Sequence, residues 1–149
     1  MKIILASKSQ VRKKILETNK INCIVVPSNV NEDQVKDSLL AVGANPMMIS
    51  KNLAELKSIK ISNKYPEQLV LGADSVISLN NELINKPNTR AESLHILKRL
   101  NGSTHHLITS VCISKNGAMV WNFTEQSELK MKKLSNEQLK IYLKKIKTK

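Results

Sequence analysis

The stretch "IILASKSQVRKKIL", residues 3–16, decides the fold class, because a short apolar run leads directly into a helix-forming segment. Residues 3–6 are predicted as a buried strand. Ser9 is predicted as the N-cap of a helix that runs to about Thr18 with its apolar residues on one face. A strand followed at once by a helix is typical of an α/β domain.

The rest of the chain alternates in the same way and then ends in a hairpin and a helix. Further strands are predicted at 22–26, 69–79, 82–84, 104–114 and 118–132, and further helices at 47–61, 89–100 and from 135 onward. Asn116-Gly117 is a strong hairpin signal. Glu32 and Asp33 are placed in a polar loop. We therefore predict one α/β domain over residues 1–149, with a mixed, partly antiparallel β-sheet flanked by helices.

The composition is that of a globular protein with a strong positive charge. The chain has 149 residues, 41% hydrophobic and 24% charged, and a formal net charge of +12. This charge fits nucleic-acid binding, an anionic small substrate or simply a Lys-rich surface. Only three of the basic residues are arginines and 3% of the chain is aromatic, so a nucleic-acid partner is not expected.

Cysteine spacing and apolar run length bear on location. Cys23 and Cys112 lie far apart in predicted strands, without a CxxC spacing, which favours reduced, buried thiols. No run approaches the ~20 apolar residues of a membrane helix. A cytoplasmic protein with no membrane partner is expected.

A positive cluster occupies the start of the first helix. Lys8, Arg12, Lys13 and Lys14 lie where acidic residues normally complement the helix dipole. Together with the hydroxyls of Ser7 and Ser9 and the free backbone N–H groups of a helix N-terminus, these cations make a site suited to phosphate.

Two acids and two lysines are weaker candidates when each is taken alone. Asp74 interrupts an apolar strand pair in Gly72-Ala73-Asp74-Ser75, where either a turn or a functional carboxylate explains it equally well. Glu32 is usually just a solvated acid in such a loop, and Lys57 and Lys86 are expected to be solvated. Together, however, two carboxylates for a divalent cation and several cations for phosphate oxygens would equip a site for metal-assisted attack of water on a phosphoanhydride.

Other nucleotide and metal motifs are lacking in the sequence. There is no Walker A loop and no GxGxxG. His105 and His106 are adjacent in a predicted strand and point to opposite faces, so we expect a structural role for them.

Six blocks, in order, resemble the Maf family of nucleoside triphosphate pyrophosphatases. They are "LASKSQVRKKIL" (5–16), "SNVNED" (28–33), "NLAELKSIKI" (52–61), "LGADSVI" (71–77), "NKPNTRAESLHILKRLNGSTHHLITSVCI" (85–113) and "LSNEQLKIYL" (134–143). The resemblance implies a Maf/ITPase-like fold and hydrolysis of a nucleoside triphosphate to the monophosphate and pyrophosphate with Mg²⁺ or Mn²⁺. A homodimer is the family tendency.

The resemblance also implies roles for six residues. Asp74 and Glu32 would hold the metal and orient or deprotonate water, with Asp74 as the preferred base. Ser7 and Arg12 would contact phosphate. Lys57 and Lys86 would bind phosphate and act in catalysis by neutralising the triphosphate and the departing pyrophosphate.

The chain departs from the family pattern in places. Gln10-Val11 replaces the usual Pro-Arg after Ser9, and Asn85 stands where Gly usually precedes Lys-Pro. Family members continue after the helix matching 135–145, so the domain is expected to lack the usual C-terminal segment. The Gly72-Ala73-Asp74-Ser75 block looks closer to the dTTP- and UTP-acting branch. The alternative function is a shortened, non-catalytic nucleotide- or nucleic-acid-binding remnant, using the basic surface and the lysines from Lys144 to Lys149.

Overall fold

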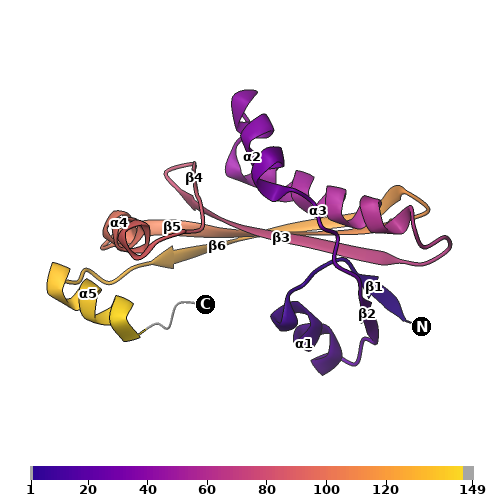
Figure 1. Cartoon of the computed structure of the whole chain (residues 1–149), viewed down its shortest axis with the longest axis horizontal. Helices are drawn as coiled ribbons and strands as arrows, with labels where there is room; N and C mark the ends of the chain where they lie inside the picture. The colour runs from indigo at the N-terminus through magenta and orange to yellow at the C-terminus, as the bar shows by residue number, and fades with distance from the viewer. Residues whose placement is uncertain (1, 146–149) are drawn as a thin grey trace.

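A single mixed sheet organises the molecule (Figure 1). The computed structural model describes residues 2–145. Its strands are β1 (Ile3–Leu5), β2 (Cys23–Val25), β3 (Val70–Leu79), β4 (Glu82–Ile84), β5 (Thr104–Lys115) and β6 (Ala118–Lys130). Its helices are α1 (Gln10–Thr18), α2 (Glu32–Ala41), α3 (Pro46–Ser62), α4 (Arg90–Leu100) and α5 (Asn136–Lys145). The predicted α/β class with a mixed sheet is confirmed.

The sheet has a parallel part and an antiparallel part, which meet at β3. Its order is β2-β1-β3-β5-β6, with β4 paired to the far end of β3. β1 lies parallel to both β2 and β3, whereas β3 is antiparallel to β5 and β5 to β6. The predicted turn at Asn116-Gly117 joins β5 to β6, with both residues at positive φ. Because it borders both parts, β3 is the strand around which the rest is arranged.

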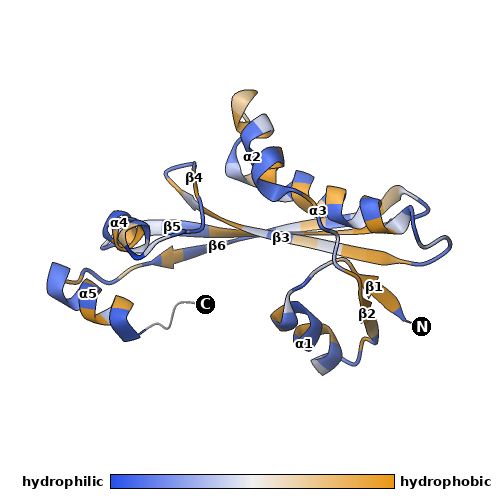
Figure 2. Cartoon of the chain, in the orientation of Figure 1, coloured by the Kyte–Doolittle hydropathy of each residue, from blue (hydrophilic) through white to orange (hydrophobic). Residues whose placement is uncertain are grey.

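Apolar residues gather where α3 covers the sheet. Ile49 and Leu53 of α3 pack with Val76 of β3 and Ile108 of β5 in a buried cluster. Figure 2 shows the short strands β1 and β2 as apolar, while α3 carries apolar and polar residues side by side. Burial of such side chains stabilises the fold by about 1.5–3 kcal/mol each.

The contact between α3 and the sheet is unusually close at Gly72. A Cβ added there would lie 2.4 Å from the backbone oxygen of Ala54 and 2.7 Å from the backbone nitrogen of Ser58. Small hydroxyl side chains fill the same interface. Ser50 of α3 donates to the backbone oxygen of Asp74 and to Ser110 of β5. These bonds satisfy buried polar groups and fix α3 against β3.

Among the described strands, β6 lies at one edge of the sheet, and its residues are largely exposed. Trp121 and Phe123 stack along this strand, with ring centroids 6.3 Å apart, and are 49% and 54% exposed. Within the described part of the chain, β6 pairs only with β5.

One prediction about local structure is wrong, and one alternative that the sequence leaves open is excluded. Glu32 does not lie in a loop: it begins α2, whose N-cap Asn31 accepts a hydrogen bond from the backbone N–H of Gln34. At Gly72-Ala73-Asp74 the sequence leaves a turn open as one of two explanations, and the structure excludes it. These residues lie inside the continuous strand β3, opposite residues 110–112 of β5, so the predicted strand over 69–79 is confirmed. A local turn preference is overridden because neighbouring strands flank this backbone.

The remaining predictions differ from the structure in small ways. Cys112 is buried as expected, but Cys23 is only partly buried, and both are free thiols. Lys147 and Lys149 of the basic tail lie outside the described residues. None of the described helices is long and apolar enough to cross a membrane.

Candidate active site

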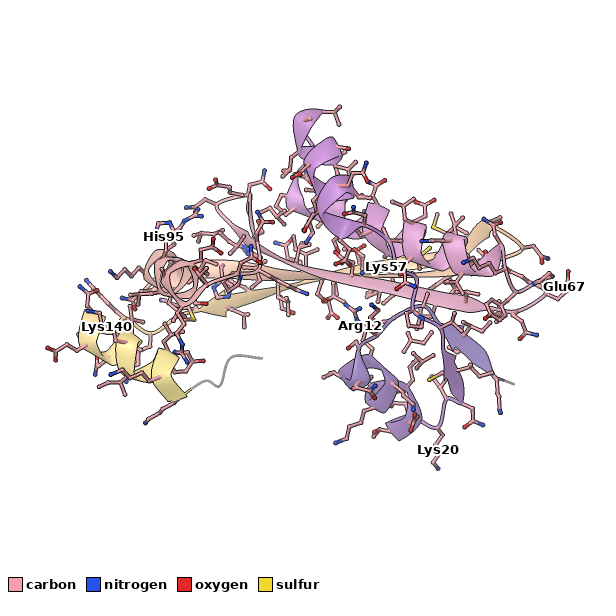
Figure 3. All side chains as sticks on the ribbon, in the orientation of Figure 1. Arg12, Lys20, Lys57, Glu67, His95 and Lys140 are labelled. Carbon is pink, nitrogen blue, oxygen red and sulfur yellow. The ribbon has the colours of Figure 1, made fainter. Side chains whose placement is uncertain are left out.

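All six predicted site residues line one cavity of about 530 Å³. They are Ser7, Arg12, Glu32, Lys57, Asp74 and Lys86. The cavity is lined by residues that directly follow β1, by the middle of β3 and by the first turns of α2. Figure 3 labels Arg12 and Lys57, which come from α1 and α3 and line this cavity together. Segments distant in sequence therefore converge on one cleft, as the resemblance implied.

One side of the cleft is the N-terminal end of α1. Ser9 caps this helix by accepting a hydrogen bond from the backbone N–H of Arg12 at 3.2 Å. Ser7 Oγ accepts from the backbone N–H of Ser9 at 3.1 Å and from Arg12 Nη1 at 3.3 Å. The hydrogen bond to Ser7 thus holds the Arg12 guanidinium close to the N-terminus of α1. A phosphate bound there would interact with both the guanidinium and the positive end of the helix dipole.

The other side is built on α2 and α3 and centres on Lys57. Lys57 Nζ lies 2.5 Å from Glu32 Oε1 and 3.2 Å from Asp74 Oδ1. It also donates to the backbone oxygen of Ala73 at 3.3 Å. Lys57 is 8% exposed and Asp74 5% exposed, so the expectation of a solvated lysine at position 57 is wrong. A buried charge needs such partners.

Asp74 has an oxygen without a protein partner. Its Oδ1 faces Lys57, but its Oδ2 is buried and makes no hydrogen bond among the described residues. A buried, unpaired carboxylate oxygen is costly and points to a group that the protein itself does not supply.

The two carboxylates that share Lys57 titrate differently. Burial raises the pKa of Asp74 above its ordinary value, and the charge and hydrogen bond of Lys57 offset this only in part. Partial burial also opposes ionisation of Glu32, but the hydrogen bond from Lys57 and the charges of Lys57, Lys36 and Lys86 outweigh it and lower the pKa of Glu32. Asp74 is therefore the more basic carboxylate, which suits a proton acceptor.

Six further polar residues line the cleft beyond the predicted ones: Lys8, Ser9, Ser28, Asn29, Lys36 and Ser75. Lys8 belongs to the positive cluster at α1, and Ser75 follows Asp74 in β3. Lys36 is not identified from the sequence, because a loop is predicted where the structure has α2. In a helix, Lys36 follows Glu32 by one turn and shares its face, so the Glu32–Lys36 spacing is the signal that could have found it.

The acid pair fits a hard divalent cation. Mg²⁺ in phosphate sites is commonly held by one or two carboxylates, with water and substrate phosphate oxygens as the other ligands. Asp74 and Glu32 supply two carboxylates, and Asp74 Oδ2 is free to bind. Residues 2–145 contain no cluster of three or more His, Cys, Asp or Glu side chains that could hold a metal without substrate.

The fold is similar to that of solved structures. A HAM1 protein from Coxiella burnetii superposes with a TM-score of 0.56 at 15% identity, over 87% of this chain and 72% of that one. A nucleoside-triphosphatase, or dITP/XTP pyrophosphatase, from Mycobacterium abscessus gives 0.53 at 12% identity, over 86% and 72% of the two chains. At this identity the likeness defines the fold class alone.

Sequence relatives define the family. The chain belongs to the Maf-like protein family, whose sequence model matches residues 2–149. A protein of Pelagibacter ubique named nucleoside triphosphate pyrophosphatase is 61% identical over 144 residues, which cover 97% of this chain and 74% of that protein. A protein of the same name from Ruegeria pomeroyi is 38% identical, over 95% of this chain and 71% of its own length.

Proposed function

We propose that this protein hydrolyses a nucleoside triphosphate to the nucleoside monophosphate and pyrophosphate. The observation that carries the proposal is the ion-paired group of Lys57, Asp74 and Glu32 in a cleft whose other charged residues are all cations. The names of the relatives agree with it. A site for neutral ligands would have no use for this arrangement, whereas a phosphoanhydride needs both the base and the positive charges.

Asp74 is the proposed base. In the reaction, the oxygen of water forms a bond to the phosphorus on the nucleoside side, and the bridging oxygen leaves with pyrophosphate and the bonding electron pair. The proton of water passes to the Asp74 carboxylate, whose raised pKa favours proton acceptance.

The basic residues hold the phosphates on the two sides of this base. Ser7 and Arg12 bind from the α1 side, while Lys57 and Lys86 neutralise the triphosphate and the pyrophosphate as it departs. Lys57 must exchange part of its contact with the two acids for a phosphate oxygen. A Mg²⁺ or Mn²⁺ ion bound to Asp74 and Glu32 would add positive charge at the same phosphates.

Several finer points remain predictions. These are a preference for dTTP or UTP, which depends on Gly72-Ala73-Asp74-Ser75, a homodimer, and a cytoplasmic location. The one sheet that joins the described strands and the family match over residues 2–149 support treating residues 1–149 as a single domain.

Pyrophosphate release from a panel of triphosphates tests the function. We expect turnover with Mg²⁺, loss of turnover with a chelator, and a loss of at least about a hundredfold in Asp74→Asn, since a positioned base contributes about that much or more. Asp37→Asn is the matched control, because Asp37 is an exposed acid of α2 outside the cleft. Full activity in Asp74→Asn would refute the assignment of the base. Salt-sensitive binding to DNA or RNA without turnover would instead favour the non-catalytic alternative.

A further inference from the structure

Lys36 is a cation of the cleft that the proposed reaction has not used. It lies in α2, one turn after Glu32, is partly buried and lines the same cavity. Its charge reaches the centre of the site, because it lowers the pKa of both Glu32 and Asp74 against the effect of burial.

Other lysines near the α2 side of the cleft have partners, whereas Lys36 has no acidic partner among residues 2–145. Lys57 is held by Glu32 and Asp74. Lys60 donates to the backbone oxygen of Asn29 at 3.1 Å. Glu32, the helical neighbour with which Lys36 could pair, is turned toward Lys57 instead. Among the described residues, no carboxylate lies within ion-pair distance of Lys36.

A cation that is partly buried without an acidic partner is costly unless an anion completes it. The cleft contains five cations, Lys8, Arg12, Lys36, Lys57 and Lys86, but only two acids, Glu32 and Asp74. Both acids contact Lys57. The excess positive charge therefore has three sources. Lys8 and Arg12 supply it on the α1 side, Lys36 on the α2 side, and Lys86 in the loop after β4.

We infer that Lys36 is a phosphate-binding residue that makes the cleft selective for a polyphosphate chain over a single phosphate group. A chain of several linked phosphates can contact both Arg12 of α1 and Lys36 of α2, since these side chains line the same cavity as Asp74. A single phosphate can occupy only one side. The inference rests on the proposed function, because it treats the cleft as the site of the triphosphate.

Binding of inorganic tripolyphosphate and of inorganic phosphate to the full chain tests this role separately from catalysis. Calorimetry on wild type, Lys36→Gln and Lys36→Arg, without added metal and then with Mg²⁺, gives the affinities. We expect Lys36→Gln to weaken tripolyphosphate binding about tenfold, the usual effect of losing a charged hydrogen bond, and to change phosphate binding less than twofold. Lys36→Arg should keep most of the affinity. Lys51→Gln is the matched control, because Lys51 is an exposed lysine of α3 outside this cleft.

The outcomes separate the two proposals. Equal tripolyphosphate affinity in Lys36→Gln and wild type would overturn the role of Lys36, even if wild type hydrolyses nucleotides. An equal loss in Lys36→Gln and Lys51→Gln would overturn it too, since general charge would then explain the effect. Absence of turnover in a wild type that binds tripolyphosphate through Lys36 would count against the proposed reaction alone.

Discussion

Replacing Gly72 by alanine tests the closest contact in the fold. The added methyl carbon would lie 2.4 Å from the backbone oxygen of Ala54, and ordinary contact begins at 3.4 Å, so α3 or β3 has to move by about 1 Å. Both neighbours are backbone atoms, which cannot rotate away as a side chain can. Overpacking of this kind costs about 3 kcal/mol.

The same displacement reaches the site. Lys57 belongs to α3 and Asp74 to β3, and their ion pair is 3.2 Å long. A shift of about 1 Å between these elements would stretch it beyond ionic contact and leave a buried carboxylate with less compensation. We therefore expect Gly72→Ala to lower both stability and turnover.

Thermal unfolding followed by circular dichroism measures the first effect. For a domain of this size, about 3 kcal/mol corresponds to a fall in Tm of roughly 10 °C. Gly43→Ala is the matched control: Gly43 has a φ of +83° with nothing within 4 Å of an added Cβ, so it should lose only the backbone cost of about 1 kcal/mol. A Gly72→Ala protein that melts within about 2 °C of wild type would refute the close approach of α3 to the sheet.

Two further predictions concern Asp74 and the serines beneath it. Because the folded-state pKa of Asp74 is raised above 3.8, the folded protein retains a proton that the unfolded chain has lost, and this contribution to stability falls as pH rises from the unfolded to the folded pKa. The Tm of Asp74→Asn relative to wild type, measured without metal, should therefore increase across that interval; a difference independent of pH would contradict this. Ser50→Ala removes the hydrogen bonds to the Asp74 backbone oxygen and to Ser110 and should cost about 1–2 kcal/mol in urea unfolding, while Ser93→Ala, in the exposed part of α4, should cost less than half as much.

Local signals in the sequence identified the elements whose ends are fixed by their own residues. Ser9 caps α1, and Asn116-Gly117 turns the chain between β5 and β6. In both cases the decisive hydrogen bond or φ angle lies within a few residues, so the sequence alone contains it.

Interactions between distant segments could not be found in this way. Gly72-Ala73-Asp74 has turn-forming composition but is strand, because β5 pairs with it along its length. Lys57 appears solvent-facing from composition, yet Asp74 and Glu32 enclose it. The six site residues could be grouped only through the family resemblance, since no spacing along the chain shows that α1, α2, α3 and β3 meet at one cleft.

The exposed tryptophan of β6 allows association at this strand to be followed by intrinsic fluorescence. Trp121 is the chain's single tryptophan, is about half exposed, and lies outside the residues that line the cleft. Indole fluorescence moves to shorter wavelength when water leaves the ring. A blue shift on concentrating the protein or adding another macromolecule would thus report association at this strand, without a dye and without confusion with nucleotide binding.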